Sequence, residues 1–124
     1  MPQPLHVLIV EDQPADAELM LAQLRKTDYE IRSMTAKREP EFIAALKEHL
    51  DVILADYTLP DFSVPRALQL LKERSLDIPL IVVTGSLGDE AAAECIKLGA
   101  SDYILKDRLA RLPEAIAQAL ETRR

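Results

Sequence analysis

The stretch VLIVEDQPAD, which runs from Val7 to Asp16, joins a run of aliphatic residues directly to two adjacent carboxylates, Glu11 and Asp12. An aliphatic run of this kind is typical of a strand that is buried on both faces of a parallel sheet. Pro14 then indicates the start of a helix, because proline is tolerated in the first turn, where its missing N–H would have no partner. Two neighbouring acids at the end of a buried strand repel each other, so we look in the rest of the chain for groups that offset this repulsion.

Short apolar runs alternate with helical patterns along the whole chain. Five segments are predicted to be strands, namely 5–10, 30–34, 51–55, 79–84 and 102–105. The first, third and fourth are almost wholly apolar, whereas the second alternates polar and apolar residues and therefore suits the edge of a sheet. Four helices are expected to begin at prolines, which are Pro14, Pro40, Pro65 and Pro113. The second helical pattern extends to Leu50, and Gly99 is predicted to end the fourth helix.

The alternation predicts a single α/β domain over residues 1–124, built as a (βα)5 doubly wound parallel sheet. Strand–helix–strand connections are right-handed almost without exception, so the helices should cover both faces. Ligands of such sheets bind beyond the carboxyl ends of the strands. The residues that follow the apolar runs are therefore the first place to look for a functional site.

Composition and charge exclude several classes of protein. The chain has 124 residues, 48% of them hydrophobic, and one cysteine, so a disulfide framework and a cysteine-based zinc site are excluded. A net charge of -6 disfavours direct nucleic-acid binding, which needs a basic face. No apolar run is long enough to span a membrane, and we expect a cytoplasmic protein. His6 and His49 are interpreted as structural or surface residues rather than as a metal pair.

Polar residues stand at the ends of four of the five predicted strands. Glu11 and Asp12 follow the first, Asp56 follows the third, Thr84 ends the fourth and Lys106 follows the fifth. Two unit charges about 4 Å apart repel by about 4 kcal/mol at an effective dielectric of about 20, so three ionised carboxylates need a cation beside them. Oxygen ligands of this kind suit Mg²⁺, which accepts a few carboxylates together with phosphate.

The same residues can support phosphoryl transfer. A carboxylate is a competent nucleophile toward phosphorus and forms an aspartyl phosphate, while a lysine and Mg²⁺ stabilise the charge on the transferring group. Each residue also has a plainer interpretation on its own: Glu11 and Asp12 as acids at a helix N-terminus, and Lys106 as a solvated surface lysine. Their occurrence together favours the metal site.

The ordered motifs ED, ADYTLPD, VVTGS and YILKD resemble the receiver domain of two-component response regulators over essentially the whole chain. The resemblance implies a flavodoxin-like sheet with strand order 2-1-3-4-5. It also implies that Asp56 is the phosphoacceptor. Mg²⁺ would be held by Glu11, Asp12, the Asp56 carboxylate and the backbone carbonyl of Thr58. Thr84 would hydrogen-bond the phosphoryl group, Lys106 would pair with one of its oxygens, and Tyr103 would be the aromatic switch residue.

Partners follow from the resemblance as well. The phosphoryl donor would be a histidine kinase or a histidine phosphotransfer protein, and a downstream protein would bind the surface formed by the fourth helix, fifth strand and fifth helix. The resemblance is also compatible with a homodimer. Such a domain would be regulatory rather than an enzyme, although it would assist its own phosphorylation and dephosphorylation. The sequence does not say whether the chain is a stand-alone receiver or part of a longer protein.

Two departures from the family pattern carry expectations of their own. The family usually has proline after the lysine, often with a cis peptide bond, whereas this chain has Asp107. Because a cis bond without proline is costly, we expect a trans bond and an altered connection to the fifth helix. Many members have a glycine in the loop after the phosphoacceptor, whereas Val64 stands near that place in PDFSVP. The start of the third helix is therefore expected to differ.

Two other functions are open to the same fold. A flavin-binding electron carrier would need a loop rich in Ser, Thr and Gly after the first strand, and the acidic EDQPAD would repel a phosphate that comes without a metal. A phosphorylation-silent receiver that serves as a docking module would need none of the acids, and their retention argues against it.

Overall fold

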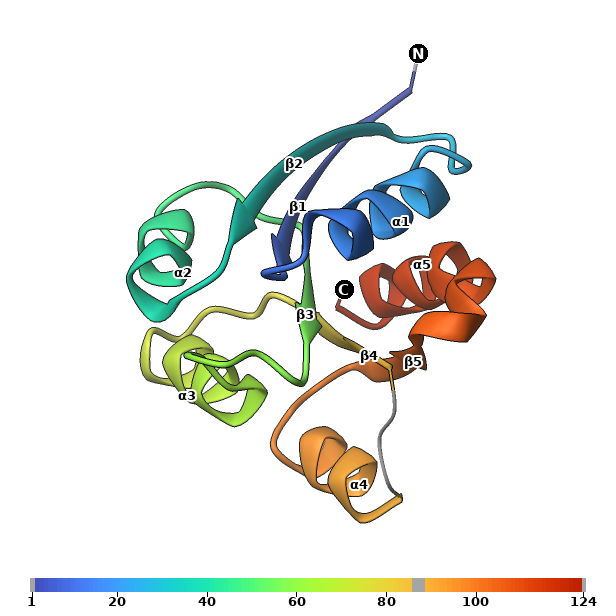
Figure 1. Cartoon of the computed structure of the whole chain (residues 1–124). Helices are drawn as coiled ribbons and strands as arrows, with labels where there is room; N and C mark the ends of the chain where they lie inside the picture. Colours follow the sequence, from blue (N-terminus) through green and yellow to red (C-terminus); the bar gives the residue numbers. More distant parts are fainter. Residues whose placement is uncertain (1, 86–88, 124) are drawn as a thin grey trace.

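The computed structural model describes residues 2–85 and 89–123. Its strands form one parallel sheet in the order β2-β1-β3-β4-β5, so the predicted doubly wound, flavodoxin-like fold is confirmed (Figure 1). The strands are β1 (Pro4–Val10), β2 (Glu30–Ala36), β3 (Val52–Asp56), β4 (Leu80–Thr84) and β5 (Asp102–Leu105). The helices are α1 (Pro14–Leu24), α2 (Glu39–Ala45), α3 (Val64–Glu73), α4 (Asp89–Lys97), the short 3₁₀ helix η1 (Lys106–Arg111) and α5 (Leu112–Arg123).

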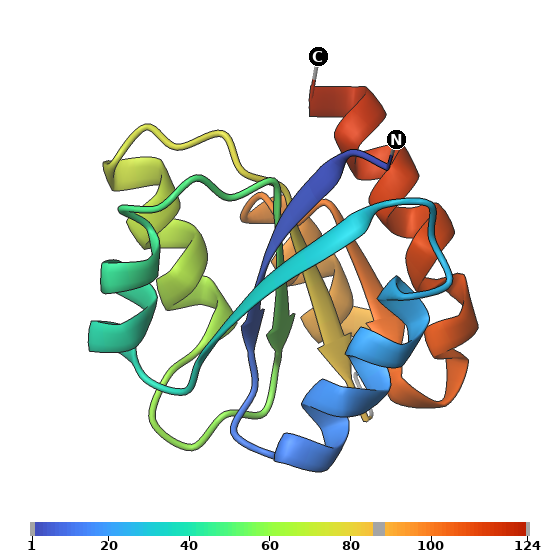
Figure 2. The ribbon, with the colours of Figure 1, turned by 90° about the horizontal axis from the view of Figure 1, so that it is seen from above.

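Helices cover both faces of the sheet, which explains why the central strands are so apolar. Helices α1 and α5 lie on one face, and α2, α3 and α4 on the other (Figures 1 and 2). In β1, Leu8 and Val10 point into the core under α2 and α3, whereas Val7 and Ile9 point into the core under α1 and α5. Alternate residues from Val7 to Val10 therefore enter two different cores, and each of these positions takes an apolar residue.

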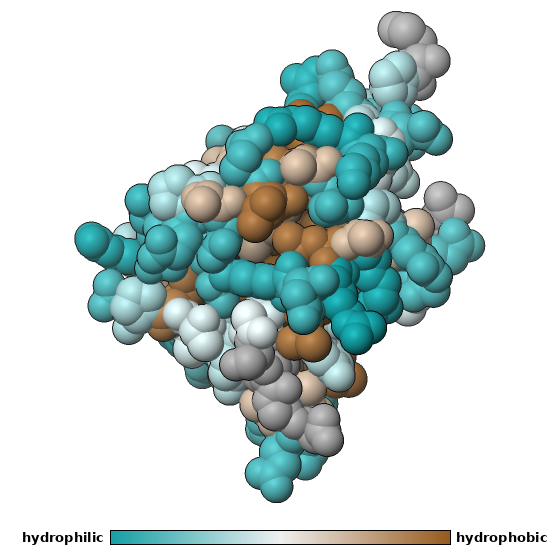
Figure 3. Space-filling model, turned by 45° about the vertical axis from the view of Figure 1, so that its right-hand side comes forward, coloured by the Kyte–Doolittle hydropathy of each residue, from teal (hydrophilic) through white to brown (hydrophobic). Residues whose placement is uncertain are grey.

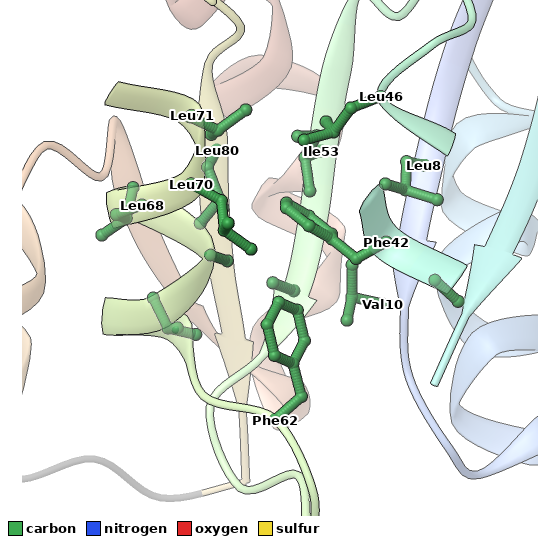
Figure 4. Close-up of a cluster of buried hydrophobic side chains, with 14 of the residues drawn as sticks. Leu8, Val10, Phe42, Leu46, Ile53, Phe62, Leu68, Leu70, Leu71 and Leu80 are labelled. Carbon is green, nitrogen blue, oxygen red and sulfur yellow. The ribbon is translucent and has the colours of Figure 1, made fainter. Parts of the chain in front are cut away.

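The larger core joins the middle of the sheet to α2 and α3 (Figure 4). Phe42 from α2 is fully buried there, and its ring centroid lies 5.1 Å from that of Phe62 in the β3–α3 connection. Val64, which stands near the place of the family's glycine, is also buried, and the Ser63 hydroxyl accepts a hydrogen bond from the Arg66 N–H at 3.2 Å. Helix α3 thus begins with a capped and anchored first turn.

The predicted strands are confirmed with small changes at their ends. β2 continues to Ala36, two residues farther than predicted, because its last residues pair with Ile9 and Val10 of β1. It lies at the edge of the sheet, as its alternating pattern indicated. The four prolines stand within the first two residues of their helices, and Gly99 follows α4 with φ +118°. Such a backbone conformation favours glycine at the end of a helix.

The second helix is shorter than its hydrophobic pattern predicted. It ends at Ala45, and the backbone N–H groups of Lys47 and Glu48 each donate to the carbonyl three residues earlier. The chain therefore tightens into a turn, which brings Leu50 into the core from outside the helix. The sequence pattern was wrong here because a buried residue in such a turn can continue the spacing of the helix.

The connection from β5 to α5 contains no proline and takes the form of η1. No cis peptide bond occurs in residues 2–85 and 89–123, so the expected trans bond between Lys106 and Asp107 is confirmed.

Within the described part of the chain, no helix is both long and apolar enough to cross a membrane. The face of the molecule in Figure 3 is mainly hydrophilic, with hydrophobic residues gathered in a small central area.

Candidate functional site

The carboxyl ends of the strands lie on one edge of the sheet, where the arrowheads of the strands point in Figure 2. Asp56 is the last residue of β3 and Thr84 the last of β4, while Glu11 follows β1 and Lys106 follows β5. Glu11, Asp56 and Thr84 are the buried polar residues of the described chain, and each residue is at most 3% exposed. Polar and charged side chains are costly to bury, so a cluster of them marks this edge of the sheet as a specialised site.

Lys106 is the centre of this cluster. Its Nζ donates to Glu11 Oε1 at 2.8 Å, to Asp56 Oδ2 at 3.0 Å and to Asp16 Oδ2 at 2.7 Å. All three donor positions of one ammonium are therefore engaged by carboxylates from β1, β3 and α1. One positive charge faces three acids, so the site keeps an excess of negative charge whenever the acids are ionised.

Asp16 is the residue that sequence reasoning missed. It stands in the first turn of α1, where an acid is common because it interacts favourably with the helix N-terminus. Its position in the first turn of the helix that directly follows Glu11 and Asp12 is the signal that could have revealed it. Asp16 holds Lys106 from the side of α1, so the lysine is oriented by a helix as well as by two strands.

The Asp56 carboxylate is held by donors on both oxygens. Its Oδ1 accepts hydrogen bonds from the Thr58 N–H at 3.0 Å and from the Thr58 hydroxyl at 3.1 Å. Its Oδ2 accepts from Lys106. The carboxylate is thereby oriented before any ligand arrives. Such prior orientation favours a reaction in which the carboxylate is the nucleophile. The role of the Thr58 carbonyl as a metal ligand stays a prediction.

Glu11, Asp12 and Asp56 can hold a divalent cation. Each offers one carboxylate oxygen, and these three oxygens lie within 4.8 Å of one another. An octahedral Mg²⁺ with ligands at about 2.1 Å spaces them about 3 to 4 Å apart, so a small movement of the side chains would complete the site. Ligands that are all oxygens, with Asp12 partly exposed at the rim, suit a hard cation that keeps some of its water.

The pKa values of Glu11 and Asp56 depend on each other, because the two carboxyl groups are buried side by side. Burial, followed by the hydrogen bond with Asp56, raises the pKa of Glu11 to about 7, although Lys106 acts in the opposite direction. Burial also raises the pKa of Asp56, but hydrogen bonds from Glu11, the Thr58 N–H and Lys106 outweigh it and hold that pKa below its ordinary value. Near neutral pH without a metal, Glu11 is therefore protonated in only part of the molecules, whereas Asp56 is ionised. A bound cation would take the place of the proton on Glu11.

Stability of the metal-free chain is expected to fall as the pH rises from 5 to 8. A carboxyl whose pKa is higher in the folded chain than in the unfolded one stabilises the fold at acid pH, and this contribution is lost as the pH rises through about 7. Asp56 titrates below this window, so it does not oppose the change. We expect a loss on the order of 2 kcal/mol in the free energy of unfolding.

A Glu11→Gln variant isolates this effect, because glutamine is neutral throughout. Urea unfolding at pH 5 and pH 8 should give a pH dependence in the wild-type chain that is absent from Glu11→Gln and kept in Glu121→Gln, whose side chain is exposed on α5. Addition of Mg²⁺ at pH 8 should restore the stability of the wild type. Equal pH dependence in the wild type and in Glu11→Gln would contradict the assignment.

Thr84 and Tyr103 lie on β4 and β5, the two strands that follow β3 in the order of the sheet. Thr84 is fully buried and stands opposite Leu105 in the β4–β5 register, one residue before Lys106. Tyr103 stands opposite Val82, is partly buried, and packs against the core that lies under α2, α3 and α4. Both residues thus connect the carboxyl edge of the sheet with the side on which α4 lies.

Comparison with known proteins decides the family. The family model of the response regulator receiver domain matches residues 7–117. This chain belongs to that family. Receiver domains are regulatory signalling domains of two-component systems, and they interact with histidine kinases and with output domains.

Relatives agree with this receiver domain in sequence and in structure. The chain is 32% identical to the response regulator protein PilR of Pseudomonas aeruginosa over 117 residues, which cover 94% of the chain and 26% of PilR. It is 32% identical to the methanogenesis regulatory protein FilR1 of Methanothrix harundinacea over 126 residues, which cover 96% of the chain and 28% of FilR1. The chain thus spans only about a quarter of the length of these two curated relatives.

Solved structures of receiver domains share the fold. The signal receiver domain of a LuxO repressor protein from Vibrio parahaemolyticus superposes with a TM-score of 0.85 at 24% identity, over 97% of this chain and 92% of that one. The receiver domain of NtrC4, solved as a beryllofluoride-activated dimer, superposes with a TM-score of 0.84 at 28% identity, over 96% of this chain and 98% of that one. The first of these likenesses confirms the receiver fold alone.

Proposed function

We propose that this receiver domain accepts a phosphoryl group on Asp56 and thereby switches its affinity for a partner protein. The donor is the phosphohistidine of a histidine kinase or of a histidine phosphotransfer protein. One observation supports the proposal above the others: a buried carboxylate at a strand end is held by Thr58 on one oxygen and by Lys106 on the other. A docking module that is never phosphorylated has no need for this arrangement.

The chemistry is a displacement at phosphorus. As an oxygen of the Asp56 carboxylate forms a bond to phosphorus, the P–N bond of the phosphohistidine breaks and its electron pair stays on the imidazole nitrogen. Lys106, already beside Asp56, pairs with an oxygen of the phosphoryl group and offsets its charge. Glu11, Asp12 and Asp56, together with the Thr58 carbonyl, would hold Mg²⁺, which would supply the positive charge that lets an anionic donor approach an acidic site.

The same residues assist dephosphorylation, which ends the signal. Hydrolysis of the aspartyl phosphate by water passes through a similar distribution of charge, so Lys106 stabilises it as well, and a bound Mg²⁺ would add to this effect. The domain therefore controls how long it stays phosphorylated, but it turns over no free metabolite as its main task.

The signal leaves the site through Thr84 and Tyr103. Phosphorylation replaces the single negative charge of the Asp56 carboxylate with about two negative charges on the phosphoryl group, and the Thr84 hydroxyl and Lys106 are drawn toward them. Tyr103, on the α4 side of β5, then repacks, and the surface formed by α4, β5 and α5 changes its affinity for a downstream protein. Because NtrC4 was solved as an activated dimer, a second copy of this chain is one candidate for that partner.

A Thr84→Val variant separates phosphorylation from this response. Valine keeps the shape of threonine but lacks its hydroxyl, so Asp56 should still be phosphorylated while the surface no longer responds. Amide NMR spectra with and without phosphorylation should show changes in β4, α4, β5 and α5 of the wild type and much smaller changes there in the variant. Equal changes in both proteins would contradict the role of Thr84.

The proposed function is tested by phosphorylation with a small donor. The chain is incubated with acetyl phosphate and Mg²⁺, and its intact mass is recorded with and without a chelator. We expect a gain of one phosphoryl group that the chelator prevents. No gain, together with no binding of Mg²⁺, would instead indicate a receiver that serves as a docking module.

A further inference from the structure

A second group of metal-binding side chains lies at the opposite edge of the sheet, where the strands begin. His6 belongs to the first half of β1, His49 stands in the turn after α2, and Asp51 directly precedes β3. In Figure 2 the connection from α2 to β3 lies at the end of the sheet away from the arrowheads. The three residues come together because Val7 pairs with Val52, which sets His6 beside Asp51.

Each imidazole has a nitrogen near one carboxylate oxygen of Asp51, at a distance close to that between two ligands of a tetrahedral ion. His6 Nδ1 lies 3.4 Å from Asp51 Oδ2, and His49 Nε2 lies 3.1 Å from Asp51 Oδ1. Two ligands bound at about 2.1 Å to a tetrahedral Zn²⁺ stand about 3.4 Å apart. One ligand atom from each of the three residues lies within 4.8 Å of the other two.

His6 Nδ1 gives independent evidence for a ligand. This nitrogen is buried and has no hydrogen-bond partner in residues 2–85 and 89–123, since its contact with Asp51 does not have hydrogen-bond geometry. A buried polar atom without a hydrogen bond destabilises the folded chain. Coordination of a metal through Nδ1 would satisfy it.

Two of the three ligands are fixed in advance. Asp51 Oδ2 accepts a hydrogen bond from the His6 N–H at 2.8 Å, and the Asp51 N–H donates to the His6 carbonyl at 2.8 Å. The imidazole of His49 is 69% exposed, so it can turn toward an ion without disturbing the core. Its ring centroid lies 5.1 Å from that of His6, and both rings border a hollow of ≈ 400 Å³ that leaves room for water.

We propose that His6, His49 and Asp51 form a second metal site, which binds a transition-metal dication of the Zn²⁺ class. Two imidazoles and one carboxylate favour such an ion over Mg²⁺, whereas the all-oxygen ligands at the other edge favour Mg²⁺. Water fills the fourth position. The site joins the start of β1 to the turn before β3 and does not depend on phosphorylation of Asp56, so it stands or falls separately from the proposed function.

Calorimetric titration with ZnCl₂ tests the proposal. The titration is run at pH 7.5, because imidazole binds metals in its neutral form, and with excess Mg²⁺, which occupies the acidic site. We expect saturable binding of one Zn²⁺ per chain. His49→Gln, at an exposed position, should weaken it by about tenfold or more, and Zn²⁺ should shift the imidazole C–H resonances of both histidines in the wild type.

Two control variants test whether Zn²⁺ binds at the proposed site. Asp77→Asn removes an exposed acid from the loop before β4, at the same edge of the sheet, and should leave the Zn²⁺ affinity unchanged. Glu11→Gln alters the acidic site and should also leave it unchanged. The proposal fails if Zn²⁺ does not bind in the presence of Mg²⁺, if His49→Gln binds it as tightly as the wild type, or if Glu11→Gln is the variant that loses it.

Discussion

Replacing Asp56 by asparagine is expected to abolish phosphorylation of this receiver domain. The amide has almost the shape of the carboxylate, and its oxygen can still accept from Thr58, so the fold should be kept. An amide is not a nucleophile toward phosphorus, however, and the variant also loses one of the three charges that attract Mg²⁺. Phosphate-affinity electrophoresis after incubation with acetyl phosphate and Mg²⁺ should show a shifted band for the wild type and none for Asp56→Asn.

Asp61→Asn is the matched control for this experiment. Asp61 is an exposed acid in the same β3–α3 connection, five residues after Asp56, and it makes no contact with Lys106. The Asp61→Asn protein should be phosphorylated to the same extent as the wild type. A phosphorylated Asp56→Asn protein, or an Asp61→Asn protein that is not phosphorylated, would move the phosphoacceptor away from Asp56.

Removing the charge of Lys106 is expected to give the second large effect. Lys106→Met keeps the length of the side chain but leaves Glu11, Asp16 and Asp56 without their shared cation. Loss of one group that stabilises the charge of a transition state slows a reaction by about 100- to 1,000-fold. The rate of phosphorylation by acetyl phosphate at saturating Mg²⁺ should fall by this factor. Saturating metal is essential, since the variant has a more negative site and its affinity for Mg²⁺ should rise.

Lys72→Met separates this local effect from a general loss of positive charge. Lys72 is exposed on α3 and forms no ion pair in the described residues, so its replacement should leave the rate unchanged. A Lys106→Met protein that is phosphorylated within about threefold of the wild-type rate would show that the lysine orients the acids rather than stabilises the transferring group.

The strands and the edge that holds the site could be predicted because burial on both faces leaves a plain signal. The buried inner parts of β1, β3 and β4 take apolar residues at consecutive positions, so the polar residues at the end of each run, such as Glu11 and Asp56, stand out. The strand order came from the resemblance and not from the pattern, since the runs alone do not say which strands are neighbours. The end of α2 was misplaced because Leu50 is buried from a turn and not from a helix.

Contacts between distant segments were harder to foresee. Asp16 has an ordinary explanation in a first helical turn, and only its 2.7 Å contact with Lys106, ninety residues later in the chain, gives it another role. The sequence favours a structural or surface role for His6 and His49 rather than a metal pair, because their proximity depends on the register between β1 and β3. That register also sets Asp51 between them, which no local pattern indicates.

The central claim is that Asp56 carries the phosphoryl group, and chemical trapping tests it most directly. Borohydride reduces an aspartyl phosphate to homoserine, so the wild-type chain is phosphorylated with acetyl phosphate, reduced and analysed by peptide mass spectrometry. We predict homoserine at position 56, formed with Mg²⁺ and absent after chelation. Homoserine at any other carboxylate, or none at position 56 in a chain whose intact mass shows a phosphoryl group, would contradict the account.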